Sequence, residues 1–188
     1  SGFGSLISNF GILKFSEGDY IIIPRGVIWQ LAPCDKIRML IIESGGPIET
    51  PNKYRNRFGQ LLEHSPFCER DIKTPILQEA IELENGYLVK VKTFQGVQDL
   101  KYVNHPFDLV GWDGYYFPWI ISIHDFEPIV GSIHQPPPVH QTFQGSGFVI
   151  CSFVPRLFDF HLDSIPAPYP HSNLDSDEII FYSKGDFM

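Results

Sequence analysis

The chain has 188 residues, 43% of them hydrophobic, and a net charge of −8. It is therefore long enough to bury a core, and its acidity argues against a surface that binds nucleic acid or anionic lipid, which needs clustered Lys and Arg. Three widely spaced cysteines, Cys34, Cys68 and Cys151, include no C-x-x-C pair, so neither a zinc ribbon nor a disulfide framework is expected. No leader-like N-terminus or long apolar run occurs, and we expect a cytoplasmic protein.

The predicted elements are mostly short strands separated by turns rich in Gly and Pro. Clusters of β-branched and aromatic residues predict strands at residues 20–23, 39–43, 86–93, 148–154 and 178–182. One helix is expected at residues 74–84, because Thr74 can cap it and Pro75 suits the first helical position. The pattern therefore predicts an all-β fold with one short helix.

A first motif lies in residues 18–29, which read GDYIIIPRGVIW. The frame G-x5-P-x-G-x2 predicts a turn, a strand and a second turn, and it resembles the second motif of cupin barrels, which are double-stranded jelly rolls. Metal-binding cupins place a histidine where this chain has Trp29, a residue that cannot bind a metal. We expect Trp29 to fill the barrel instead. The alternative is an ordinary hairpin with Gly and Pro turns.

A second motif is PYPHSNLDSDE, residues 168–178. His171, Glu178 and Gly185 keep the spacing of the first cupin motif, H-x-H-x3–4-E-x6-G, although Asn173 replaces its second histidine. An imidazole and a carboxylate are two of the three ligands of a 2-His-1-carboxylate Fe(II) site. If residues 178–182 form a strand, Glu178 and Asp177 point to opposite faces. The alternative is an Asx-rich turn over residues 173–177 that His171 caps.

Most of the chain, from about residue 11 to residue 188, resembles the homogentisate 1,2-dioxygenase family. The stretches that carry this resemblance are YRNRFGQLLEHSPFCERD (54–71), HPFDLVGWDGYYFPW (105–119), IHDFEPIVGSIHQPPPVHQTF (123–143), CSFVPRLFDFH (151–161) and IPAPYPHSNLDSDE (165–178). The resemblance implies a two-cupin β-sandwich and an oxidoreductase that uses Fe(II) and O2 to cleave the ring of homogentisate. The implied product is maleylacetoacetate, in tyrosine and phenylalanine catabolism, and the implied assembly is a homo-oligomer, either a trimer or a hexamer.

The resemblance also implies roles for single residues. His171 and Glu178 would bind the iron, with Asp177 as the rival carboxylate because some members have a shorter gap. Tyr169 would contact the substrate. His134 would act as acid or base near a substrate hydroxyl, a role that suits an imidazole because it titrates near neutral pH.

Other readings stay open at several positions. His140 is the alternative to His134, and both histidines could instead be structural. Phe187 stands where some members have a tyrosine that contacts the substrate. Tyr54, Arg55 and Arg57 form a small basic patch. It is either a solvated or subunit-contacting surface or a site where arginine binds a substrate carboxylate through two hydrogen bonds.

The resemblance places the third iron ligand, a histidine, beyond residue 188. We therefore expect residues 1–100 to be one partial cupin unit and residues 101–188 to contain the first part of a second, catalytic unit. With two of three ligands, this chain alone is expected to have little or no dioxygenase activity. The alternative is a non-catalytic cupin that binds a small molecule or serves assembly, with a decayed metal site, which Trp29 and Asn173 favour.

Overall fold

The structure, a computed structural model, describes residues 2–133, 140–164 and 172–184. Short antiparallel strands and single turns of 3-10 helix make up its regular elements, so the all-β prediction is confirmed and the chain is consistent with a cupin-like β-sandwich. In these residues no helix is long and apolar enough to cross a membrane. The elements are β1 (Gly4–Ser8), β2 (Gly11–Phe15), β3 (Asp19–Ile22), β4 (Trp29–Pro33), η1 (Asn52–Tyr54), η2 (Glu69–Asp71), β5 (Glu84–Thr93), β6 (Gly96–Asn104), β7 (Trp119–Ser122), η3 (Ile123–Asp125), β8 (Gln141–Gly145) and β9 (Phe148–Cys151).

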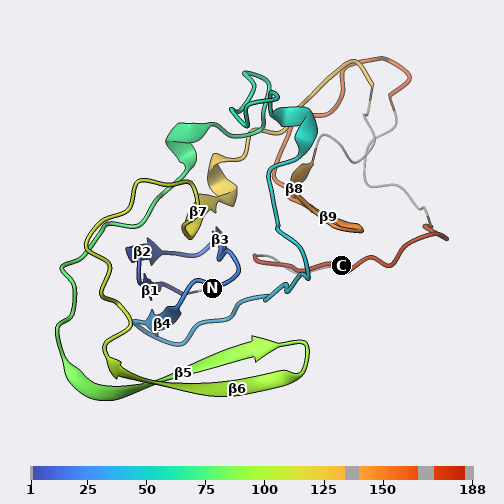
Figure 1. The fold of residues 1–188 in the computed structure, drawn as a ribbon. Helices are drawn as coiled ribbons and strands as arrows, with labels where there is room; N and C mark the ends of the chain where they lie inside the picture. Colours follow the sequence, from blue (N-terminus) through green and yellow to red (C-terminus); the bar gives the residue numbers. More distant parts are fainter. Residues whose placement is uncertain (1, 134–139, 165–171, 185–188) are drawn as a thin grey trace. The chain divides into compact units, whose positions relative to one another are not determined.

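The strands form four small sheets (Figure 1). One sheet has the order β2-β1-β4, and three pairs are formed by β3 with β7, β5 with β6, and β8 with β9. The chain divides into two compact units, each built from separate stretches of sequence. The first unit comprises residues 2–38 and 72–121, and the second comprises residues 39–71 and 122–188. The division into cupin units after residue 100 stays a prediction.

The core of the first unit lies on one face of the β2-β1-β4 sheet. Leu6 in β1 is fully buried and stands opposite Leu13 of β2 and Leu31 of β4. Phe15 and Ile120 complete the buried cluster. Alternate residues of β1 and β2 are buried, as expected when one face of a sheet packs against a core.

The motif at residues 18–29 forms the predicted turn, strand and turn. Asp19 donates its backbone N–H to the carbonyl of Ser16 at 3.2 Å, and Gly18 adopts a φ of +89°, which only glycine tolerates well. After β3, the N–H of Val27 bonds the carbonyl of Pro24 at 3.4 Å. The expectation for Trp29 is wrong, because its side chain is 46% exposed.

The position of Trp29 in the sheet explains this exposure. Trp29 is the first residue of β4 and pairs with Ser8, the last residue of β1. It therefore lies beyond the strand positions that form the core cluster around Leu6.

The predicted helix at residues 74–84 is wrong. Residues 74–83 are coil, and Ile76 exchanges two backbone hydrogen bonds of 3.0 Å with Ile12 of β2. Further along, Ile81 donates to the carbonyl of Phe107 and His105 donates to that of Leu83, both at 3.1 Å. Pairing with distant backbone therefore overrides the local capping signals, which are worth only about 1 kcal/mol.

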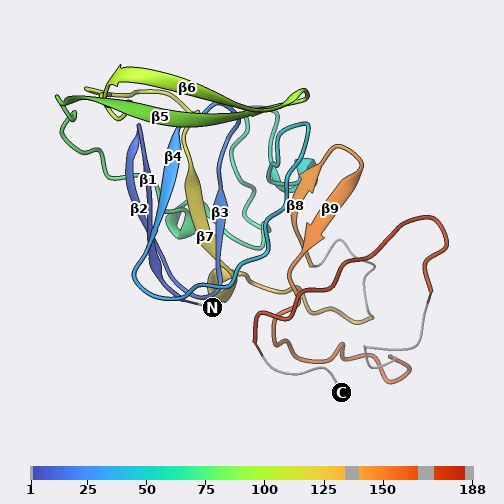
Figure 2. The ribbon, with the colours of Figure 1, turned by 90° about the horizontal axis from the view of Figure 1, so that it is seen from below.

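Some of the predicted strands are present in the structure and others are not. Residues 86–93 lie within β5, which pairs with β6 in a long two-stranded ribbon, and residues 148–151 form β9 (Figure 2, green and orange). Residues 39–43 and 178–182 belong to no strand, so those predictions are wrong. Their β-branched side chains favour extended backbone, but a strand also needs a neighbour to hydrogen-bond, and propensity alone does not supply one.

Candidate functional site

Most of the site predicted from the sequence lies outside the described residues. His134, Tyr169 and His171 fall in residues 134–139 and 165–171, and Phe187 falls in residues 185–188. Of the predicted site residues, the structure therefore describes Glu178, together with its rival Asp177 and the alternative histidine His140. The assignments to iron and substrate stay predictions for all of them.

The segment before Glu178 is a polar turn. Asn173 Oδ1 accepts the backbone N–H of Asp175 at 3.1 Å, and Asn173 Nδ2 donates to Ser176 Oγ at 2.6 Å. An Asx turn therefore exists here, and it leads directly to the two candidate carboxylates. Asp177 and Glu178 are both exposed outside any strand, so strand alternation does not separate them.

The carboxylate of Glu178 acts on the thiol of Cys151, at the end of β9. Burial raises the pKa of Cys151, the Lys53 ammonium opposes that rise, and the Glu178 carboxylate adds to it. A negative charge disfavours a thiolate beside it, which means that Glu178 lies within electrostatic reach of β9. The thiol therefore stays protonated at neutral pH and is not an activated nucleophile.

Lys53 and Tyr54, both in η1, extend this group. Tyr54 is 3% exposed, and Lys53 Nζ lies 5.0 Å from the centroid of its ring. Burial, and secondarily Cys151, raises the pKa of the Tyr54 phenol, whereas burial lowers the pKa of the Lys53 ammonium. We call Lys53, Tyr54, Cys151 and Glu178 the Lys53 cluster. Sequence reasoning missed it because its members come from three separate stretches and share no motif.

The Lys53 cluster contains a single described candidate for iron ligation, Glu178. Among residues 2–133, 140–164 and 172–184, no three side chains of His, Cys, Asp or Glu gather closely enough to hold a metal. The carboxylate of Glu178 is exposed, and its assignment to iron stays a prediction.

His140 is buried just before β8. Its side chain is 8% exposed, and its ring lies 4.8 Å from the ring of Phe153, centroid to centroid. Its carbonyl accepts the N–H of Ser152 at 2.7 Å, and the hydroxyls of Thr142 and Ser152 bond each other in the same buried layer. These contacts involve the ring face and the backbone of His140, so the choice between a structural and a functional role for its imidazole stays open.

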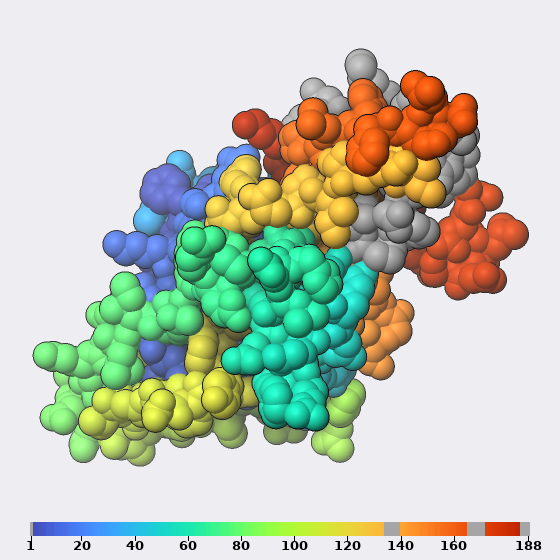
Figure 3. Space-filling model, turned by 90° about the horizontal axis from the view of Figure 1, so that it is seen from above, coloured from blue at the N-terminus to red at the C-terminus, as the bar shows by residue number. Residues whose placement is uncertain are grey.

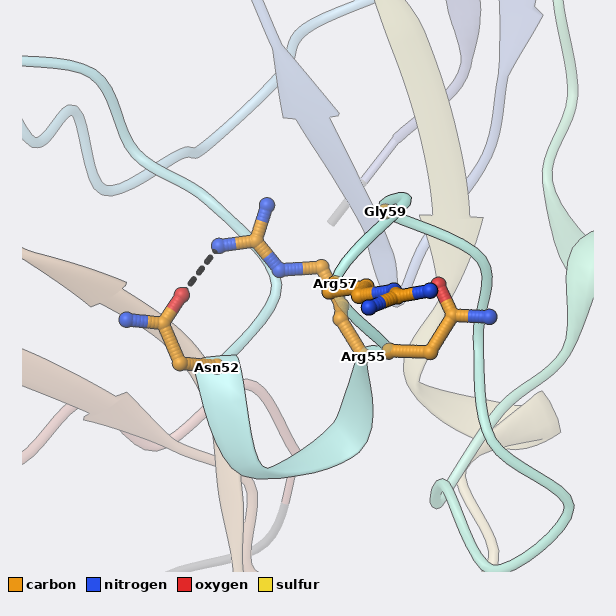
Figure 4. A pocket seen from close by; sticks show the side chains of 5 residues that line it. Asn52, Arg55, Arg57 and Gly59 are labelled. Atoms are coloured by element: carbon orange, nitrogen blue, oxygen red, sulfur yellow. Dashed lines mark hydrogen bonds between the residues drawn. The ribbon is translucent and has the colours of Figure 1, made fainter.

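A pocket of about 430 Å³ lies in the loop after η1 (Figure 4). Its lining residues are Asn52, Arg55, Asn56, Arg57 and Gly59. Residues 50–71, which contain this pocket, are drawn at the surface in Figure 3 (cyan to green). Arg57 is exposed, whereas Arg55 is partly buried and paired with Glu49.

Comparison with known proteins relates the chain to dioxygenases. No family model matches it. It is 49% identical over 96% of its length to a protein of Saccharolobus solfataricus named "Putative dioxygenase". It is 25% identical over 92% of its length to the homogentisate 1,2-dioxygenase of Rhodopseudomonas palustris, and 27% identical over 72% to that of Nitrobacter hamburgensis. These relatives confirm the resemblance to the homogentisate 1,2-dioxygenase family. The chain spans 47%, 39% and 30% of their respective lengths, so less than half of each is represented here.

Proposed function

We propose that this chain is part of an Fe(II)-dependent dioxygenase that cleaves the aromatic ring of homogentisate. The observation that carries the proposal is the 49% identity over 96% of the chain to a protein with a dioxygenase name. Two further relatives, at 25% and 27% identity, are both named homogentisate 1,2-dioxygenase, and this name supports the choice of substrate. The spacing of His171, Glu178 and Gly185 is the sequence feature that agrees with it.

Three side chains would hold the iron in this proposal. His171 and Glu178 would be two of them, and the third would be a further histidine of the whole protein. When bound, such an iron leaves coordination positions open for O2 and for the substrate's oxygen atoms. The Lys53 cluster would border the Glu178 side of this site, because the carboxylate acts on Cys151.

The remaining predicted residues would handle the substrate. His134 would take a phenolic proton at an imidazole nitrogen, and Tyr169 would orient the ring. Both oxygen atoms of O2 enter the product, so homogentisate becomes maleylacetoacetate without loss of carbon. The buried position of His140 supports leaving the proton-transfer role with His134.

We also propose that the protein is cytoplasmic and assembles into an oligomer. The large apolar side chains of the second unit that are more than 70% exposed include Phe153, Leu157, Phe158, Phe160, Leu162, Leu174 and Ile179. Apolar surface of this extent is normally covered by further polypeptide.

The test uses the natural gene product that contains this sequence. We expect Fe(II)-dependent O2 uptake with homogentisate, and a loss of bound iron in Glu178→Gln but not in the matched Asp177→Asn. Since both side chains are exposed, neither change should disturb folding. Iron-loaded protein that consumes no O2 with homogentisate would refute the substrate. Full iron content in both His171→Ala and Glu178→Gln would refute the ligand assignment, and natural protein that binds no iron would favour the non-catalytic cupin.

A further inference from the structure

The two arginines of the pocket after η1 are not equivalent. Arg55 Nη2 donates to Asn52 Oδ1 at 2.5 Å (Figure 4). It also donates to Glu49 Oε2 at 3.2 Å, so its charge is compensated. The guanidinium carbon of Arg57 lies 4.7 Å from the centroid of the Phe58 ring. Within the described part of the chain, no carboxylate pairs with Arg57. The pocket therefore carries one uncompensated positive charge.

The loop that presents Arg57 is held in one conformation. Asn56 Oδ1 accepts the N–H groups of Phe58 at 2.9 Å and Gln60 at 3.1 Å, and Asn56 Nδ2 donates to Gln60 Oε1 at 2.8 Å. Gly59 adopts a φ of +88°, which a residue with a side chain would resist. A loop ordered before binding loses less entropy when a ligand arrives, so the pocket is preorganised.

The chemistry of these groups identifies the class of ligand. A guanidinium whose face is covered by an aromatic ring keeps its N–H edge for planar oxygen acceptors, which it binds through two parallel hydrogen bonds. We propose that the pocket lined by Arg55 and Arg57 binds a small carboxylate or phosphate anion. A cation would meet two guanidinium groups, and an apolar ligand would have to desolvate them without compensation.

This anion site extends beyond the proposed ring-cleavage activity and does not depend on it. All of its lining residues come from residues 52–59, and none of them is a predicted iron ligand. Glu49, which neutralises Arg55, is the residue of this region that would oppose an anion. The site therefore predicts one substitution that weakens binding and one that strengthens it.

The test is isothermal titration of the natural protein with inorganic phosphate and, separately, with phenylacetate, at ionic strength held constant with sodium chloride. We expect saturable binding in at least one arm, and the arm that binds identifies the anion. Arg57→Gln should weaken binding about tenfold, as expected when one charged bidentate partner is lost. Glu49→Gln should tighten binding, because Arg55 then becomes available to the ligand.

The control is Arg25→Gln, which removes an exposed arginine of the first unit and should leave the affinity unchanged. Three outcomes would overturn the proposal. The first is the absence of saturable binding with either anion. The second is an unchanged affinity in Arg57→Gln. The third is a loss of affinity in Arg25→Gln as large as that in Arg57→Gln. The last would mean that the anion responds to net charge rather than to this pocket. The Glu49→Gln arm measures a gain, so a failure to fold cannot imitate it.

Discussion

Replacing Gly11 with alanine tests the contact that holds residues 74–83 against β2. Gly11 adopts a φ of +116°, and a Cβ added there would lie 2.1 Å from the carbonyl oxygen of Ile76 and 2.8 Å from the Cα of Leu77. Both are backbone atoms, so no side-chain rotation relieves the clash. The two segments have to separate, and Ile12 and Ile76 then lose their two hydrogen bonds of 3.0 Å.

The size of the effect is the sum of the conformational cost at position 11 and the loss of two hydrogen bonds. A left-handed conformation costs an L-residue about 1–2 kcal/mol, and each lost hydrogen bond costs about 0.5–1.5 kcal/mol. Gly11→Ala should therefore lower the free energy of unfolding by about 2–5 kcal/mol. Gly26→Ala is the matched control, because Gly26 has a φ of +83° but no atom within 4 Å of its added Cβ. It should cost only the conformational term of about 1–2 kcal/mol.

Urea denaturation of the natural protein, followed by circular dichroism, measures both changes. Hydrogen exchange at the amides of Ile12 and Ile76 localises the effect, since these amides should lose protection in Gly11→Ala and keep it in Gly26→Ala. Equal destabilisation by the two substitutions, with unchanged protection at Ile12, would refute the reasoning. It would mean that the close approach to Ile76 contributes nothing beyond backbone conformation.

Two further predictions concern the core and the Lys53 cluster. Leu6→Ala should destabilise the protein by about 2–5 kcal/mol, because Leu6 is fully buried. The control Leu88→Ala should lower the free energy of unfolding clearly less, because Leu88 is 54% exposed. Equal urea midpoints for the two variants would contradict the assignment of Leu6 to the core. Lys53→Gln should raise the pKa of Cys151 further, because the ammonium holds that pKa down, and so slow its alkylation by iodoacetamide at fixed pH. Peptide-resolved mass spectrometry measures the rate, Lys90→Gln is the exposed control, and faster alkylation in Lys53→Gln would contradict the electrostatic assignment.

The sequence alone was informative wherever the determining interactions are local. The turns at Gly18 and Gly26 need glycine at a positive φ, and both were predicted from their positions in the motif. The strand at residues 86–93 alternates apolar and polar residues, and the Asx turn at Asn173 depends on contacts within three residues. The all-β class follows from the same short-range signals, and the family resemblance rests on sequence stretches such as residues 54–71 and 123–143.

The tertiary structure decided what depends on contacts between distant residues. Thr74 and Pro75 signal a helix, but backbone pairing of Ile76 with Ile12 places this segment against β2. No local pattern shows that Trp29 lies at the end of its strand beyond the core, or that Glu178 acts on Cys151 beside Lys53. A sequence pattern reports the preferences of a short segment, whereas burial and electrostatic proximity depend on which segments fold together, and here those lie up to a hundred or more residues apart.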